Sequence, residues 1–101
     1  MKLIFIRHGQ TNYNLKDLCN SRPDPRVKLT ALGRQQVQAA AEKLKGEHID
    51  AIFTSALFRT HQTARVINQY HHAPTFRDPR LNDRSTGIFE GKPAGLFFEW
   101  W

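Results

Sequence analysis

A short loop near the N-terminus gathers residue types that bind and attack phosphate. Within eight positions it holds a cation, an imidazole, a glycine and several neutral donors: Arg7, His8, Gly9, Gln10, Thr11 and Asn14. Arginine offers planar, bidentate donors to phosphate oxygens, and glycine lets backbone amides approach closely. A neutral imidazole beside cations is a capable nucleophile, because neighbouring positive charge disfavours its protonated form. The loop therefore predicts a phosphate site with His8 as nucleophile; the alternative is a structural histidine in a chance tripeptide.

The segment in front of this loop is predicted to be a buried strand. Residues 2–6 form an apolar run rich in isoleucine and phenylalanine, and the run stops at Arg7. His8 would then lie at the carboxyl end of a strand, where ligands bind in open α/β sheets.

Residues 15–45 are expected to form a surface loop and then a helix. Positions 15–29, with two prolines and no clear periodicity, indicate a surface loop after a possible helical turn. Thr30 is the predicted N-cap of a helix over about 30–45 that ends at Gly46. Its inward face is expected to carry five apolar residues: Leu32, Val37, Ala40, Ala41 and Leu44.

A second strand, a second helix and a third strand are predicted further along. Residues 51–54 are a short apolar run, and Ser55 is a candidate cap for a helix whose inward face holds Leu57, Ala64 and Ile67. Residues 74–77 give a weaker strand signal. Alternating strands and helices favour an α/β fold with a mostly parallel sheet and right-handed crossovers.

Four motifs in this order resemble those of the histidine phosphatase superfamily, the phosphoglycerate-mutase-like proteins. Residues 7–14 (RHGQTNYN) are similar to its RHG-x-T-x-x-N signature, and residues 29–36 (LTALGRQQ) to its L-T-x-x-G-x-x-Q helix start. Residues 55–64 (SALFRTHQTA) resemble its S-x-L-x-R-A-x-x-T-A helix, and residues 81–91 (LNDRSTGIFEG) its L-x-E-x-x-x-G-x-x-E-G segment. The resemblance covers nearly the whole chain. It implies a partial phosphoglycerate-mutase-like three-layer sandwich whose C-terminal half is missing.

The resemblance also implies a role for each matching residue. His8 would become a phosphohistidine, and Arg7 and Arg59 would hold the phosphoryl oxygens and stabilise their charge. The rest of the phosphate cradle would come from the first loop, through Gly9, Gln10, Thr11 and Asn14.

Two departures from the family pattern bear on catalysis. Asp83 stands where the family carries the glutamate that protonates the leaving oxygen, and it is one methylene shorter. Its alternative role is a surface ion pair with Arg80 or Arg84, and Glu90 is a weaker candidate acid. The family's second catalytic histidine lies in a downstream S-H-G-like motif that this chain does not reach. Transfer is therefore expected to be impaired.

The expected function is phosphomonoester hydrolysis through a phosphohistidine at His8. The alternatives are mutase-type transfer and a non-catalytic phosphate-binding or interaction fragment. The loop at residues 20–24 (NSRPD) resembles the phosphatase branch more than the glycolytic mutases. The expected partner is a phosphorylated small molecule, with no cofactor.

Composition limits the remaining possibilities. One domain over residues 1–101 is expected, with 40% hydrophobic and 24% charged residues and a net charge of +6. The basic residues are scattered and match no nucleic-acid module, so no nucleic-acid partner is expected. Cys19 is the only cysteine, and adjacent residues such as His71 and His72 rarely bind one metal, so no metal site is expected.

The ends of the chain suggest a location and a partner. No segment has the length of a membrane span and the N-terminal apolar run is too short for a signal peptide, so a cytoplasmic protein without a membrane partner is expected. Residues 95–101 (GLFFEWW) are strongly apolar and are expected to pack on a partner, for example in a homo-oligomer.

Overall fold

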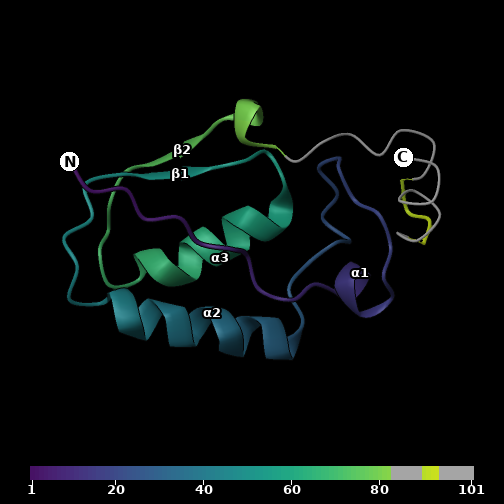
Figure 1. Ribbon diagram of the computed structural model, residues 1–101, viewed down its shortest axis with the longest axis horizontal. Coiled ribbons are helices and arrows are strands. Elements are labelled where there is room, and N and C mark those ends of the chain that lie inside the picture. The colour runs from purple at the N-terminus through teal and green to yellow at the C-terminus, as the bar shows by residue number, and fades with distance from the viewer. Residues whose placement is uncertain (83–89, 94–101) are drawn as a thin grey trace.

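The computed structural model describes residues 1–82 and 90–93, and these form two packed helices beside a small parallel sheet (Figure 1). The helices are α1 (Asn12–Leu15), α2 (Ala31–Leu44) and α3 (Phe58–Asn68), and a 3₁₀ turn, η1, covers Pro79–Leu81. The strands are β1 (Ile52–Thr54) and β2 (Thr75–Arg77). They pair in parallel, with Ile52 opposite Thr75, and α3 lies between α2 and the strands. The mixed α/β fold with a parallel sheet is thus confirmed.

Helix α2 begins where the sequence predicts and carries the core. The side chain of its N-cap, Thr30, accepts a hydrogen bond from the backbone N–H of Gly33, as a threonine cap does. Val37 and Ala41, four residues apart, are buried against Ile67 of α3. Leu32 was expected on this face but is half exposed, because it lies about 140° around the helix from Val37.

Helix α3 begins three residues later than the predicted serine cap. Its N-cap is Leu57, and no side chain caps it. Ser55 is still in the turn after β1, where its hydroxyl accepts from the Leu57 N–H at 3.2 Å and pairs with the Thr60 hydroxyl at 2.9 Å. The inward face is as predicted, since Leu57, Ala64 and Ile67 are all buried.

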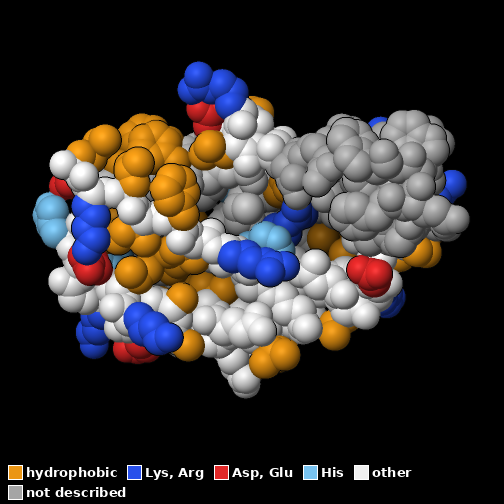
Figure 2. All heavy atoms as spheres, viewed as in Figure 1, with side chains coloured by type: hydrophobic (Ala, Val, Ile, Leu, Met, Phe, Trp, Pro, Cys, Tyr) orange, Lys and Arg blue, Asp and Glu red, His pale blue; other side chains and the backbone are white. Residues whose placement is uncertain are grey.

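Residues 2–6 do not form the predicted buried strand. All five are exposed, and their backbone makes no hydrogen bond to any described residue. An apolar run becomes a strand only where a neighbouring strand accepts and donates its backbone hydrogen bonds, and among the described residues β1 pairs with β2 and not with residues 2–6. Hydrophobic side chains accordingly gather at the surface over the strands (Figure 2), where Phe53 and Phe76 stack with their ring centroids 5.2 Å apart.

The segment predicted as a surface loop, residues 15–29, is more deeply packed than its composition indicates. Cys19, Val27 and Leu29 are all buried. Residues 18–21 pair with 90–93, because the Cys19 N–H donates to the Lys92 carbonyl at 2.7 Å and the Gly91 N–H to the Cys19 carbonyl at 2.8 Å. A distant part of the chain therefore gives this loop its shape.

In residues 1–82 and 90–93, no helix combines the length and the apolar character that a membrane crossing requires. The apolar C-terminal residues 95–101 lie outside the described residues, as does the proposed partner contact there.

Candidate active site

The ring of His8 is held in one orientation by two groups of opposite hydrogen-bonding character. Its Nδ1 is 2.7 Å from the carbonyl oxygen of Gly9, and its Nε2 is 3.1 Å from Nε of Arg59. A carbonyl can only accept and a guanidinium can only donate. The neutral ring therefore carries its proton on Nδ1 and its lone pair on Nε2. That lone pair is the group a nucleophilic histidine needs.

Arg59 reaches His8 from the first turn of α3. Although it is charged, it is only 9% exposed, which requires hydrogen-bonding partners. Besides His8 it donates to the side-chain oxygen of Asn20, in a very short contact, and to the Asn20 carbonyl at 3.4 Å. The guanidinium is thus fixed in position at the imidazole, and its predicted contact with phosphoryl oxygens stays a prediction.

Two glycines let the His8 loop pass close to α2. A Cβ on Gly9 would lie 2.4 Å from the Gly33 carbonyl oxygen, and a Cβ on Gly33 only 2.0 Å from that of Gln10. Neither position has room for a side chain without moving backbone. The Gln10 N–H donates to Gln36 Oε1 at 3.0 Å, which ties the loop to the same helix.

Thr11 and Asn14 shape the loop through a capping box. The Thr11 hydroxyl accepts from the Asn14 N–H at 3.1 Å, and Asn14 Oδ1 accepts from the Thr11 N–H at 2.9 Å. Thr11 is 1% exposed, so in this structure it supports the turn and is not open to solvent. Its predicted phosphate contact remains a prediction, as does that of Asn14.

The other predicted residues are less closely associated with His8. Arg7 is exposed and forms no hydrogen bond or ion pair with a described residue, which leaves its guanidinium available to an incoming anion. Asp83, the predicted acid, lies outside the described residues. Glu90, the weaker candidate, accepts the Ser21 N–H on both carboxylate oxygens, at 2.8 and 2.9 Å.

Asn20 belongs to the site, although it is not among the residues predicted from the sequence. It is adjacent to Ser21, so the Glu90 contact and the pairing of residues 18–21 with 90–93 hold it against Arg59. No local pattern marks it, because its role depends on a segment some seventy positions away. The neighbouring Cys19 is no rival nucleophile: burial, with Glu90 and Asp17 nearby, raises the pKa of its thiol.

Comparison with known proteins identifies the family of this chain. The family model for the histidine phosphatase superfamily (branch 1) matches residues 3–96. The chain belongs to this superfamily. It is 36% identical over 88 residues to the uncharacterized phosphatase PhoE of Bacillus subtilis, covering 87% of this chain and 45% of that protein.

Other superfamily members include both mutases and phosphatases. The chain is 38% identical over 96 residues to a 2,3-bisphosphoglycerate-dependent phosphoglycerate mutase of Haemophilus influenzae, covering 90% of this chain and 41% of the mutase. It also superposes on the α-ribazole phosphatase of Shigella flexneri with a TM-score of 0.81 at 29% identity, over 93% of this chain and 46% of that one. The chain thus spans somewhat less than half the length of these histidine phosphatase relatives.

Proposed function

We propose that this chain carries the phosphoryl-accepting part of a histidine phosphatase active site and serves the hydrolysis of phosphate monoesters. The observation that carries the proposal is the His8 ring, whose Nε2 lone pair is set by Gly9 on one side and by Arg59 on the other. The substrate class is a small phosphorylated molecule, because Arg7 and Arg59 provide the charge that a phosphoryl group needs.

In the first step the Nε2 lone pair attacks phosphorus, forming a P–N bond while the P–O ester bond breaks. Arg59 Nε, which now donates to the lone pair, would transfer its hydrogen bond to a phosphoryl oxygen as the bond forms. The leaving oxygen takes a proton, and the resemblance assigns that proton to Asp83. In the second step water attacks phosphorus and gives a proton back to the carboxylate assigned to Asp83, the P–N bond breaks, and His8 regains its lone pair as inorganic phosphate leaves.

Mutase-type transfer uses the same first step and differs in the acceptor, which is a second substrate oxygen instead of water. The relatives named above include both activities. We favour hydrolysis on the phosphatase-like loop at residues 20–24.

A second candidate function is an interaction module. The specific observation is the apolar surface over β1 and β2, where Leu3 is 67%, Phe5 90% and Phe53 64% exposed. A patch of this kind marks an association surface on a soluble protein.

The proposal is tested by phosphorylating the chain with phosphoramidate, a small phosphoryl donor that needs no leaving-group acid from the protein. Acid-labile phosphate mapped by mass spectrometry should appear on His8, vanish in His8→Ala and persist in the matched control His61→Ala. Label that persists in His8→Ala would rule out the nucleophile assignment. A strictly monomeric chain at all concentrations would count against the interaction module.

A further inference from the structure

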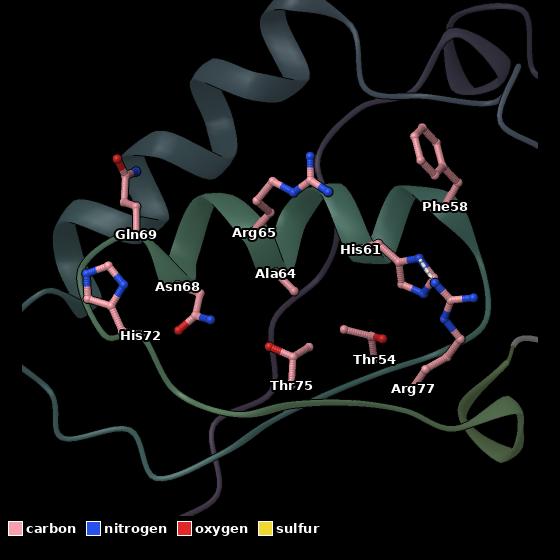
Figure 3. A pocket seen from close by; sticks show the side chains of 10 residues that line it. All are labelled: Thr54, Phe58, His61, Ala64, Arg65, Asn68, Gln69, His72, Thr75 and Arg77. Carbon is pink, nitrogen blue, oxygen red and sulfur yellow. Dashed lines mark hydrogen bonds between the residues drawn. The ribbon is translucent and has the colours of Figure 1, made fainter.

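A groove on the far side of α3 from His8 has no role in the chemistry above. It lies between α3 and the paired strands and has a volume of about 730 Å³ (Figure 3). His61 and Arg77 lie at one end, His72 lies at the other, and Thr54 and Thr75 lie between the helix and β2. We call this feature the α3–β2 groove.

The α3–β2 groove is lined by positive and neutral groups only. No Asp or Glu is among its ten lining residues, and Arg65 and Arg77 make no ion pair with a described residue. Arg26 and Arg80, outside the groove, are each paired with an aspartate two positions earlier. Two uncompensated guanidiniums in one concave surface attract an anion.

The floor of the groove contains a buried hydroxyl without a partner. Thr54 is 5% exposed, and its Oγ1 is buried with no hydrogen-bond partner in the part of the chain that the structure describes. Native proteins rarely leave such a group unsatisfied, so its presence at a ligand-sized opening needs an explanation. An anionic oxygen seated at this end would accept from the Thr54 hydroxyl and from Arg77, most of whose donors are unused.

The groove is elongated along the helix. Positions 61 and 68 on α3 are about 10 Å apart at the rise of an α-helix, and His72 lies beyond the helix end. His72 has a φ of 52°, a left-handed backbone conformation that is uncommon outside glycine. Nitrogen donors of Arg77, Arg65 and His72 therefore recur along a length that exceeds a single phosphate.

We propose that the α3–β2 groove binds an extended polyphosphorylated anion, with one phosphate at Thr54 and Arg77 and further negative charge along Arg65 and His72. This site is separate from the His8 site, since Arg59 and His61 are two positions apart on α3 and so point about 160° away from each other around the helix. The proposal does not depend on phosphoryl transfer at His8.

The test is a titration of the ¹⁵N-labelled chain with tripolyphosphate, followed by amide NMR. Saturable shifts are expected at Thr54, Arg65 and Arg77. Arg77→Gln should weaken binding by about tenfold or more, the loss expected for a charged hydrogen bond. Arg34→Gln, which removes an equal exposed charge from α2, should change it by less than about twofold.

Thr54→Val provides a second variant, and it leaves the hydrogen bond between Arg77 and His61 Nδ1 in place. It should weaken binding by about threefold without lowering the melting temperature, because the lost hydroxyl has no partner to leave unpaired. Equal affinity in wild type and Arg77→Gln would overturn the proposal. So would an equal loss in Arg34→Gln, or shifts confined to the residues around His8.

Discussion

Two imidazole–guanidinium pairs lie on opposite sides of α3, and they differ in what else each imidazole contacts. His8 Nε2 faces Arg59 at 3.1 Å, and His61 Nδ1 faces Arg77 at 3.0 Å. The remaining nitrogen of His8 donates to the Gly9 carbonyl, whereas that of His61 donates to the Ser55 carbonyl at 2.8 Å. The two neutral rings therefore hold opposite tautomers.

The difference explains why one pair is suited to chemistry and the other to structure. The lone pair of His8 is on Nε2, the nitrogen farther from the backbone, and the buried Arg59 is held there by Asn20. The lone pair of His61 is on Nδ1, next to the ring carbon that carries the side chain, and its partner Arg77 is exposed. A histidine near an arginine is thus not by itself a nucleophile.

The largest expected effect comes from the close backbone crossing between the His8 loop and α2. Gly33→Ala would place a Cβ 2.0 Å from the Gln10 carbonyl oxygen, so the free energy of unfolding should fall by about 2 kcal/mol or more, a drop of roughly 10 °C in Tm. The matched control is Gly46→Ala, whose Cβ meets nothing within 4 Å. Thermal melts that are equal for the two variants would contradict the tight crossing.

The second-largest effect is expected when Arg59, and not Arg77, is replaced by lysine. Arg59→Lys removes the Nε donor and the planar fork, so phosphoramidate labelling of His8 should slow by about tenfold to a hundredfold. Arg77→Lys should leave the rate within about twofold. Similar rates in both variants would show that the His8–Arg59 pair has no special role.

Glu90 is expected to act through the Asn20 loop. Glu90→Gln weakens the carboxylate contact with the Ser21 N–H, loosens Asn20 and should slow labelling by about threefold to tenfold. Glu42→Gln is the control: it disturbs a carboxylate that is bonded to Tyr70, far from His8, and should leave labelling unchanged. If Glu90→Gln labels at the wild-type rate, the loop does not position Arg59.

The smallest effect is a pH dependence on the His61 side. Arg80 lowers the pKa of Asp78 to about 2, so this carboxylate favours the folded state at pH values above its ordinary pKa and loses that contribution as the pH falls through about 2. Asp78→Asn should therefore reduce Tm slightly near neutral pH, and the difference should close at about pH 2. A constant difference across this range would exclude the ion pair as its cause.

Local patterns in the sequence predict the two long helices and single out His8 as a candidate. The Thr30 cap and, apart from Leu32, the inward faces of α2 and α3 follow from spacing and capping chemistry, which act within a few residues. Residues 2–6 are not a strand, because pairing depends on a neighbour that no local pattern specifies. Asn20 was not predicted either, because its position depends on residues 90–93, which are distant in the sequence and hold its loop against Arg59.

The tautomers of His8 and His61 test the central claim most directly. Two-bond ¹H–¹⁵N correlation of the imidazole rings, at a pH where both are neutral, should show the proton of His8 on Nδ1 and that of His61 on Nε2. In Arg59→Gln the preference of His8 should weaken while that of His61 is unchanged. A His8 ring protonated on Nε2 would contradict the assignment of this nitrogen as the nucleophile.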